Sequence, residues 1–444
     1  MTSPASARAL LPLGLFLSLF LGVGLWFTAL GHVDAFYQLR APIAILPAIA
    51  LALWLGRRSK PLDTFLAGMG NSDVMLMCLI FLLAGAFAAV SKAIGGVDAV
   101  VYLTLSAIPS WLALPGLFLV AGFVALAMGT SMGTIAAVAP IALGVAEAAG
   151  IEPALALGAV LSGATFGDNL SVISDTAIAA SRLQGASMRD KFRANFWLAI
   201  PAAIACLVLL AALGTSSSAP PPAATASPWL ALPYLLVLVL ALIGIDVLIV
   251  LSVGLLLAGA FGLALKTDYS LAVFSNDIYA GFEGMFEITL LSLLIGGLAA
   301  LVRAQGGLTW LAARIARLAG GSGRRSGEFS IAAVATVTDV FTANNTVALL
   351  ISGNTAREIA ERHGVSPARS ASLLDVFACV TQSVLPYGAQ ILLAASIAKA
   401  SPLQLVGTVH YGWLLALVAL ASIALGLPRR AGQPGQPGLA SQAG

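Results

Sequence analysis

The stretch of chain best equipped for chemistry is residues 163–181, inside a strongly apolar region. It carries two aspartates, Asp168 and Asp175, with hydroxyl residues between them. Broken polar chain is tolerated within a membrane only where it lines a protein cavity, and ionisable groups at that depth are usually functional. A buried carboxylate binds a small hard cation such as Na⁺ or takes a proton. Since the two compete for one site, such a site predicts cation/proton exchange.

The composition is that of an integral membrane protein. Of 444 residues, 59% are hydrophobic and 9% charged, against about 25% charged residues in a soluble domain, and the mean hydropathy is +0.99. The apolar runs are too long and unbroken for barrel strands, which leaves helices in a lipid bilayer. The three cysteines and three histidines lie scattered. We therefore expect no disulfide set, no His/Cys metal site, no cofactor besides the transported ions and no nucleic-acid partner.

Eight apolar segments are long enough to be membrane helices. They are residues 10–30, 41–55, 74–90, 192–213, 229–243, 247–265, 286–302 and 404–427. The first follows a single arginine, as in a secretory signal, but it exceeds the roughly 7–15 apolar residues that are typical there. Longer, polar-interrupted regions occupy 111–183 and 326–400, and the Gly/Pro-rich tail 428–444 is expected to be disordered.

Short sequence matches recur along the chain at a nearly constant offset. Residues 130–134 match 342–346 (342 − 130 = 212), and 92–97 match 303–308 (303 − 92 = 211). Three further matches have offsets of 213 to 215, and all five occur in the same order in the two halves. Five ordered matches indicate an internal duplication. We predict a first repeat at 1–213, an uncharged linker at 214–228 and a second repeat at 229–427.

Basic loops orient the two repeats, because loops rich in Lys and Arg stay cytoplasmic. As one helix, the 39 residues of 111–149 would extend about 58 Å at 1.5 Å per residue, against a bilayer core of about 30 Å. If 326–362 crossed instead of re-entering, the arginines of 357–369 would lie outside. We therefore predict re-entrant hairpins at 111–149 and 326–362, and single spans broken in the middle at 153–183 and 367–400.

This layout predicts an all-α polytopic membrane protein of two inverted repeats. Each half crosses the bilayer five times, giving about ten crossings, and the odd number inverts the second half relative to the first. Both chain termini then lie in the cytoplasm. The arrangement is typical of secondary transporters, which bind substrate at the midplane between broken helices.

Four polar interruptions could form that site: the hairpin tips at 129–134 and 342–346, and the helix breaks at 167–176 and 382–390. The repeat offset pairs Asp168 with Gln382 and Asp175 with Gln390, so the first half keeps carboxylates where the second keeps amides. We predict that Na⁺ binds at Asp168 and Asp175. The surrounding shell is expected to include Asn169, Thr130, Thr134, Asn344, Asn345, Thr346, Gln382 and Gln390.

Three further acidic residues, Asp339, Asp375 and Glu287, are candidates for proton coupling because they lie in or beside apolar helices. Each candidate has a structural alternative. Small and hydroxyl residues also serve close helix packing, the aspartates also serve as hydrogen-bond acceptors, and Glu287 also suits an interfacial anchor.

The sequence from Gly163 to Thr176 resembles the signature of NhaC-type sodium/proton antiporters, G-A-x-F-G-D-x-x-S-P-x-S-D-T. Residues 281–287, 367–375 and 385–390 are similar to the same family, and the resemblance extends from about 60 to 427. It implies the ion-transporter fold of two inverted repeats. It also implies an ion path lined by Asp168, Ser171, Ser174, Asp175 and Thr176. Two departures are Val172, where proline is usual, and Asn169, where a charged residue is frequent.

We expect an inner-membrane secondary antiporter, not an enzyme, that exchanges Na⁺ for H⁺, with Li⁺ and K⁺ as alternative cations. Relatives of this kind also exchange organic acids or amino acids, so a coupled metabolite exchanger stays open, and arginines facing the cavity would favour it. An intramembrane aspartyl protease would also use two membrane aspartates, but it needs no inverted duplication. Homodimers are common for such folds, by analogy only.

Overall fold

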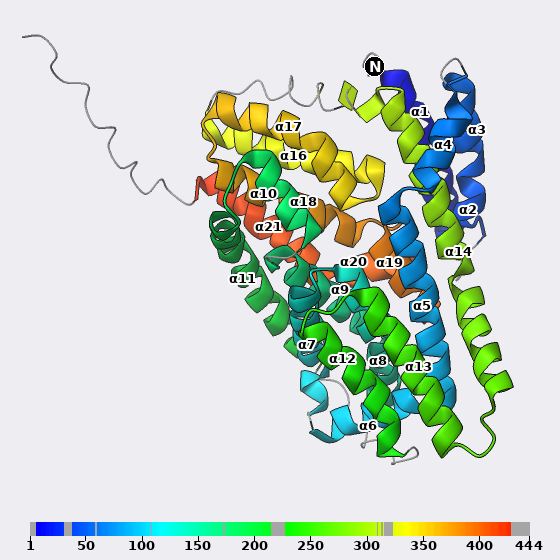
Figure 1. Ribbon diagram of the computed structural model, residues 1–444. Helices are drawn as coiled ribbons and strands as arrows, with labels where there is room; N and C mark the ends of the chain where they lie inside the picture. Colours follow the sequence, from blue (N-terminus) through cyan, green and yellow to red (C-terminus); the bar gives the residue numbers. More distant parts are fainter. Residues whose placement is uncertain are drawn as a thin grey trace, which may run out of the picture.

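The computed structural model describes residues 6–30, 38–57, 60–107, 109–171, 174–214, 227–308, 310–311, 314 and 323–427. This part of the chain is helical and contains no strand (Figure 1). Long apolar runs favour helices because a helix satisfies its backbone hydrogen bonds internally. The predicted all-α fold class is confirmed. Most of the linker, residues 215–226, and the tail 428–444 lie outside the described residues.

The helices of the first half are η1 (Ala7–Leu10), α1 (Leu11–Ala29), α2 (Ala41–Ala44), α3 (Leu46–Leu55), α4 (Pro61–Met69), α5 (Ser72–Ile94), α6 (Gly96–Ala107), η3 (Ser110–Leu112), α7 (Ala113–Met128), α8 (Ser131–Ala149), α9 (Pro153–Leu170), α10 (Asp175–Gln184) and α11 (Met188–Leu213). Those of the second half are η4 (Pro228–Ala231), α12 (Leu232–Leu242), α13 (Val247–Leu265), α14 (Leu271–Ala304), α16 (Arg324–Thr342), α17 (Asn345–His363), α18 (Pro367–Val384), α19 (Ala389–Ala398), α20 (Pro402–Thr408) and α21 (His410–Leu425).

The helix boundaries themselves repeat along the chain. Helices α8, α9 and α10 begin at positions 131, 153 and 175, and α17, α18 and α19 begin at 345, 367 and 389. The offset between equivalent starts is constant (345 − 131 = 214, 367 − 153 = 214 and 389 − 175 = 214). It pairs Asp168 with Gln382, as expected. It pairs Asp175 with Ala389 and Thr176 with Gln390, one position from the pairing that the sequence matches suggested.

The equivalent long helices of the two halves run antiparallel. Helices α4 and α5 together correspond to α14, and they pack along it with glycines at the contacts. A Cβ on Gly85 would lie 2.4 Å from the carbonyl oxygen of Gly281, and one on Gly68 would lie 2.6 Å from that of Gly296. Because the residue number rises on one side of these contacts and falls on the other, the helices have opposite directions. The hairpins α7/α8 and α16/α17 likewise lie towards opposite ends of the molecule (Figure 1), as inverted repeats require.

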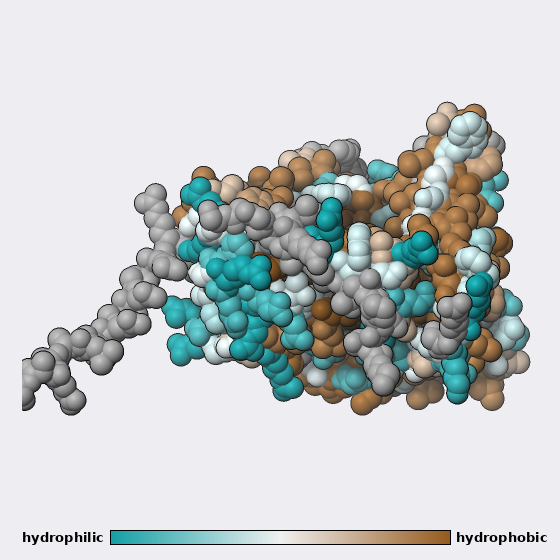
Figure 2. All heavy atoms as spheres, turned by 90° about the horizontal axis from the view of Figure 1, so that it is seen from above, coloured by the Kyte–Doolittle hydropathy of each residue, from teal (hydrophilic) through white to brown (hydrophobic). Residues whose placement is uncertain are grey.

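Length and composition make eight described helices candidate membrane spans, or nine if the bent pair α20/α21 counts as one. Seven of these coincide with predicted crossings and the bent pair supplies an eighth. The remaining two predicted crossings are the shorter apolar helices Ala41–Leu55 and Pro228–Leu242. The other candidate span is α8, which belongs to a hairpin that we predict to be re-entrant. Figure 2 shows hydrophilic residues gathered on the face seen from above, with apolar surface around them.

Both hairpins turn inside the segments predicted as their tips. Helix α7 is capped by Gly129 and α16 by Ala343, two positions related by the repeat offset (343 − 129 = 214). Each capping residue has a positive φ, 67° and 50° respectively. Glycine adopts this left-handed conformation freely, whereas alanine does so at a cost. Both broken spans also contain a break between their helices. Ser171 and Ser174 are not helical and lie between α9 and α10, and residues 385–388 lie between α18 and α19.

Two glycines of the segment 163–176, which carries Asp168 and Asp175, allow close packing of α9 on α7. A Cβ on Gly163 would lie 2.2 Å from the carbonyl oxygen of Phe118, and one on Gly167 would lie 2.1 Å from that of Gly122. Small residues allow such backbone contact between membrane helices. The packing fixes the end of α9, where Asp168 lies.

Candidate functional site

One cavity of about 120 Å³ brings both hairpin tips and both helix breaks together. Its described lining includes Thr130, Asp168, Ser174, Asp175, Thr176, Asn344, Asn345, Thr346, Gln382 and Gln390, all expected from the sequence. These residues come from both repeats and are far apart in the chain. At about 30 Å³ per water molecule, the cavity has room for roughly four waters, or for a partly hydrated monovalent cation.

Three carboxylates line this cavity, all from the first half of the chain: Asp73, Asp168 and Asp175. Asp168 is buried with 5% of its surface exposed, and the hydroxyl of Ser174 donates to its Oδ1 at 2.7 Å. Asp175 is exposed within the cavity. The described His, Cys, Asp and Glu side chains form no group of three around one point. Any cation held here therefore needs the other oxygen donors of the cavity.

Those donors are supplied by the second half. Gln382 and Gln390 are buried and line the cavity. Their amide nitrogens donate to the carbonyl oxygen of Ala343 at 3.3 Å and to the hydroxyl of Ser131 at 2.6 Å. Each Oε1 accepts no hydrogen bond from the part of the chain that the structure describes. Buried carbonyl-type oxygens without a donor are suitable ligands for a cation.

Four half-helices begin at the cavity. Residues at the starts of α8, α10, α17 and α19 all line it, namely Ser131, Asp175, Asn345 and Ala389. Helix N-termini carry partial positive charge, which stabilises carboxylates and disfavours an unpaired cation. Asp175 lies in the first turn of α10 and Asp73 in the first turn of α5. The helix ends therefore stabilise the carboxylates, and the carboxylates offset the charge of the helix ends.

Three residues expected at the site do not line this cavity. The hydroxyl of Ser171 donates to the carbonyl oxygen of Leu126 at 3.0 Å, and that of Thr134 to the carbonyl oxygen of Thr130 at 3.0 Å. Both bonds hold backbone in place beside the cavity. Asn169 points into a different cluster.

That cluster is a buried ion pair between Lys191 and Asp375, with 2.6 Å between Nζ and Oδ2 and side-chain exposures of 2% and 0%. Asn169 and Asn195 donate to the same Oδ2 at 3.2 and 2.9 Å. Asn195 also donates to the carbonyl oxygen of Asn169 at 2.9 Å. The cluster joins α9, α11 and α18 directly beside Asp168. Asp375 is therefore neutralised by a lysine, a partner that no local sequence pattern indicates.

The two other candidates for proton coupling differ in their surroundings. Asp339 is fully buried in α16, and neither carboxylate oxygen has a hydrogen-bond partner among the described residues. Glu287 lies on α14, is 38% exposed and pairs with Arg40 at 3.4 Å. Neither residue lines the 120 Å³ cavity that contains Asp73, Asp168 and Asp175, which is called the carboxylate cavity below.

Two polar residues of the cavity were not expected from the sequence, Asp73 and Ser131. Asp73 follows the N-cap Asn71 of α5, whose side chain accepts a hydrogen bond from the Asp73 backbone N–H at 2.9 Å. An acidic residue in a first helical turn usually marks a helix start, so its sequence context indicated a structural role. Ser131 lies inside the predicted tip at 129–134, for which the sequence predicts the neighbouring Thr130 and Thr134 as ligands.

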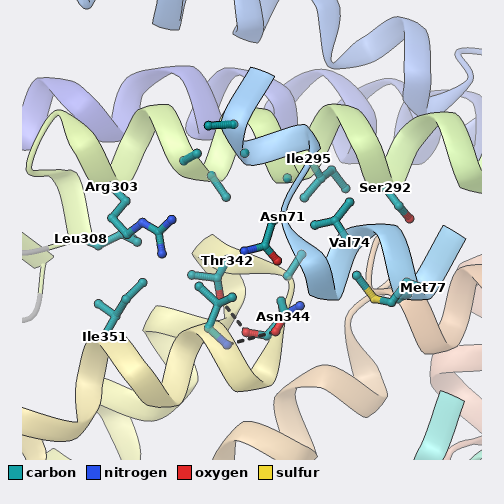
Figure 3. A pocket seen from close by; sticks show the side chains of 18 of the residues that line it. Asn71, Val74, Met77, Ser292, Ile295, Arg303, Leu308, Thr342, Asn344 and Ile351 are labelled. Atoms are coloured by element: carbon teal, nitrogen blue, oxygen red, sulfur yellow. Dashed lines mark hydrogen bonds between the residues drawn. The ribbon is translucent and has the colours of Figure 1, made fainter. Parts of the chain in front are cut away.

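A second cavity of about 350 Å³ lies next to the first, between α4, α5, α14 and the α16/α17 hairpin. The two cavities share Met77, Asn344 and Ala389 as lining residues. Figure 3 shows Arg303 from α14 together with Asn71, Thr342 and Asn344 around this space.

Paired hairpins and broken helices around a shared polar cavity define the class of secondary transporters. A sequence profile of the Na⁺/H⁺ antiporter family matches residues 26–215 and 218–427. The chain belongs to this family, and the predicted NhaC-type resemblance is confirmed.

Known relatives match about half of the chain. This chain is 33% identical over 213 residues to the malate-2H⁺/Na⁺-lactate antiporter of Bacillus subtilis (strain 168), and the match covers 48% of this chain and 44% of that one. It is 29% identical over 268 residues to the Na⁺/H⁺ antiporter NhaC of the same strain, covering 56% and 58%. The chain thus spans about half the length of these curated relatives.

Among solved structures, the YdaH transporter of Alcanivorax borkumensis aligns with a TM-score of 0.41 and 14% identity, covering 95% of this chain and 99% of that one.

Proposed function

We propose that this chain is a secondary antiporter that exchanges a monovalent cation, Na⁺ first, for protons at the carboxylate cavity. The observation that carries the proposal is the composition of its wall. Asp168 and Asp175 of the first repeat face the same space as Gln382 and Gln390 of the second, whose Oε1 atoms accept no hydrogen bond from described residues. Membership of the Na⁺/H⁺ antiporter family supports the same activity.

In this proposal the cation and the proton compete for Asp168 and Asp175. A deprotonated Asp168, held by the Ser174 hydroxyl, binds the cation together with amide oxygens of the opposite repeat. Protonation removes the negative charge and releases the cation. Because the donors come from both repeats, relative movement of the repeats would expose the site to one side of the membrane and then the other.

The remaining features of the proposal follow the layout predicted from the sequence. The chain would be a multi-pass protein of the inner membrane with both termini in the cytoplasm, and a homodimer is compatible with the fold. Of the three candidates for proton coupling, Asp339 has the strongest support, because it alone is fully buried without a described partner.

The test uses the full chain in proteoliposomes that contain a pH-sensitive dye. Addition of Na⁺, Li⁺ or K⁺ to vesicles with an acidic lumen should move protons outwards, and Asp175→Asn should abolish this response while the protein stays folded. Asp98→Asn is a matched control, because Asp98 is also an exposed carboxylate in a first helical turn, that of α6, and lines neither of the two cavities. Full activity of Asp175→Asn would overturn the site assignment.

A second candidate function, coupled exchange of an organic anion, is favoured by one observation. An arginine that faces the transport cavity would favour an organic anion as substrate, and Arg303 lines the adjoining cavity of about 350 Å³.

A further inference from the structure

We propose that a groove between α11 and α21 binds an anionic phospholipid, with the phosphate head group at its arginines and the acyl chains along its apolar walls. Helices α11 and α21 pack along each other (Figure 1). The groove between them has a volume of about 1230 Å³, above the roughly 300–1,000 Å³ of small-molecule sites. It shares no lining residue with the two cavities described above. It is called the lipid groove below.

The polar end of the lipid groove is formed where five helices begin or end. Its lining residues come from the starts of α11, α16 and α18 and from the ends of α17 and α21. Three arginines are among them, Arg193, Arg324 and Arg369. A guanidinium forms paired hydrogen bonds with phosphate oxygens. The basic loops at these helix ends are predicted to be cytoplasmic, and the cytoplasmic leaflet of a membrane carries anionic lipids.

Two carboxylates, Asp190 and Glu361, also line the lipid groove. The hydroxyl of Ser187 donates to Asp190 at 2.7 Å, and Glu361 pairs with Arg357, one turn before it in α17, at 3.0 Å. Both carboxylates therefore have partners of their own. Arg193 is exposed and forms no ion pair or hydrogen bond with the described residues, so its guanidinium is available to a ligand.

Arg369 provides a second, buried guanidinium in the wall of the groove. Its side chain is 5% exposed, and its Nη2 donates to Oε2 of Glu328 at 3.2 Å and to the hydroxyl of Ser422. Its Nε is buried without a hydrogen-bond partner among the described residues. A buried charged group whose donors are only partly paired is costly. An anion in the groove would stabilise this charge.

The remaining wall of the groove is apolar and follows one exposed face of α11. Trp197 and Pro201 line the groove, and Ile204 and Val208 continue the same face at helical spacing. Trp197 is 73% exposed, Ile204 58% and Val208 66%. Because α11 is a candidate membrane span, this face is suited to acyl chains. From Arg193 onwards α11 thus presents charge first and apolar surface next, in the order of a phospholipid.

A topological role is the alternative explanation for Arg193, because basic residues beside a membrane helix keep the adjoining loop in the cytoplasm. Arg189 provides the control. It lies one turn earlier on the same helix and is exposed, but it does not line the groove. If positive charge at this helix end were the whole role, Arg189→Gln and Arg193→Gln would behave alike.

The experiment measures quenching of Trp197 fluorescence by brominated lipids in detergent micelles of the full chain. Phosphatidylglycerol and phosphatidylcholine with brominated acyl chains are compared at equal mole fractions, and Trp197→Phe in each background gives the contribution of Trp197. We expect phosphatidylglycerol to quench at the lower mole fraction. Arg193→Gln should reduce this preference about fivefold, the effect of one basic residue near a membrane surface. Arg189→Gln should match the wild type.

Blocking the groove gives a test that does not depend on charge. Ala421 lines the groove and is exposed, whereas Ala424 is exposed on the same helix and does not line it. Ala421→Phe should reduce quenching of Trp197 by phosphatidylglycerol, and Ala424→Phe should leave it unchanged. Thermal unfolding without added lipid checks that each variant is folded.

Three outcomes would overturn the proposal. Equal quenching by the two lipids, or equal effects of Arg189→Gln and Arg193→Gln, would indicate general contact with the bilayer. Quenching by neither lipid would assign the groove to another occupant, the tail 428–444 or a second copy of the chain. Loss of the preference on addition of inorganic phosphate equimolar with the lipid would assign the arginines to a free anion. The proposed cation/proton exchange depends on none of these results.

Discussion

In the first repeat the break between α9 and α10 carries Asp168 and Asp175, whereas the equivalent break between α18 and α19 carries Gln382 and Gln390. The helix boundaries coincide once the constant repeat offset is applied, so the backbone scaffold is shared and the chemistry is not. Amides supply neutral oxygen ligands, and carboxylates supply charge that a proton can cancel. The difference suggests that one repeat carries the titratable part of the site and the other completes the ligand shell.

The arrangement reverses in the neighbouring cavity. There the second repeat contributes the charged residue, Arg303, while its first-repeat equivalent Lys92 lines neither cavity. The duplicated scaffold therefore carries opposite charges at two adjoining places, each from one repeat only.

The largest expected effect comes from making the two breaks alike. Asp168→Gln would give the first break the residue that the second has at the equivalent position. It should reduce cation-driven proton movement to the level of empty vesicles, because the titratable charge is lost. Gln382→Ala removes one neutral ligand and should raise the cation concentration for half-maximal response several-fold without abolishing exchange. Dye-loaded proteoliposomes measure both. If Gln382→Ala were as inactive as Asp168→Gln, the proposed division of roles would be wrong.

A second prediction concerns the buried pair Lys191–Asp375. The repeat offset relates this pair to Leu405 and Leu161 (191 + 214 = 405 and 375 − 214 = 161), both buried, and α20 packs on α9 there. Lys191→Met leaves Asp375 buried without its lysine, which costs about 3–5 kcal/mol for such pairs. The double variant Lys191→Met/Asp375→Leu removes the unpaired charge and should recover part of this loss, the remainder being the hydrogen bonds that Asn169 and Asn195 donate to Asp375.

Thermal unfolding in detergent distinguishes these variants, and a double variant no more stable than Lys191→Met would show that the pair has no apolar substitute.

The smallest effect is expected from the packing glycines. Gly167→Ala places a Cβ against the Gly122 carbonyl oxygen and must separate α9 from α7, at a cost of about 1–3 kcal/mol. Its counterpart in the second repeat is Thr381, whose hydroxyl donates to the carbonyl oxygen of Phe377 in its own helix at 2.7 Å. Thr381→Ala should therefore lower the unfolding temperature less than Gly167→Ala. The reverse order would indicate that α9 and α7 adjust without strain.

Much of the fold could be predicted because its signals are local or periodic. Apolar runs indicate membrane helices, Gly129 and the polar residues beside it mark the end of a helix, and the duplicated spacing shows that the halves are equivalent. The residues around the carboxylate cavity followed from the same reasoning. Inverted repeats bring tips and breaks together, so ten of the predicted residues line one space.

Sequence alone therefore determined the helical class, the duplication, the positions of the breaks and the carboxylates they carry, since each is written within a few neighbouring residues or in their recurrence. Only the tertiary structure decided which side chains meet. It turned Asn169 away from its neighbour Asp168 towards Asp375, paired that aspartate with Lys191, brought Asp73 into the cavity and directed Arg303 into the adjoining one. Each of these depends on the rotation and packing of helices far apart in the chain, about which the spacing along one helix carries no information.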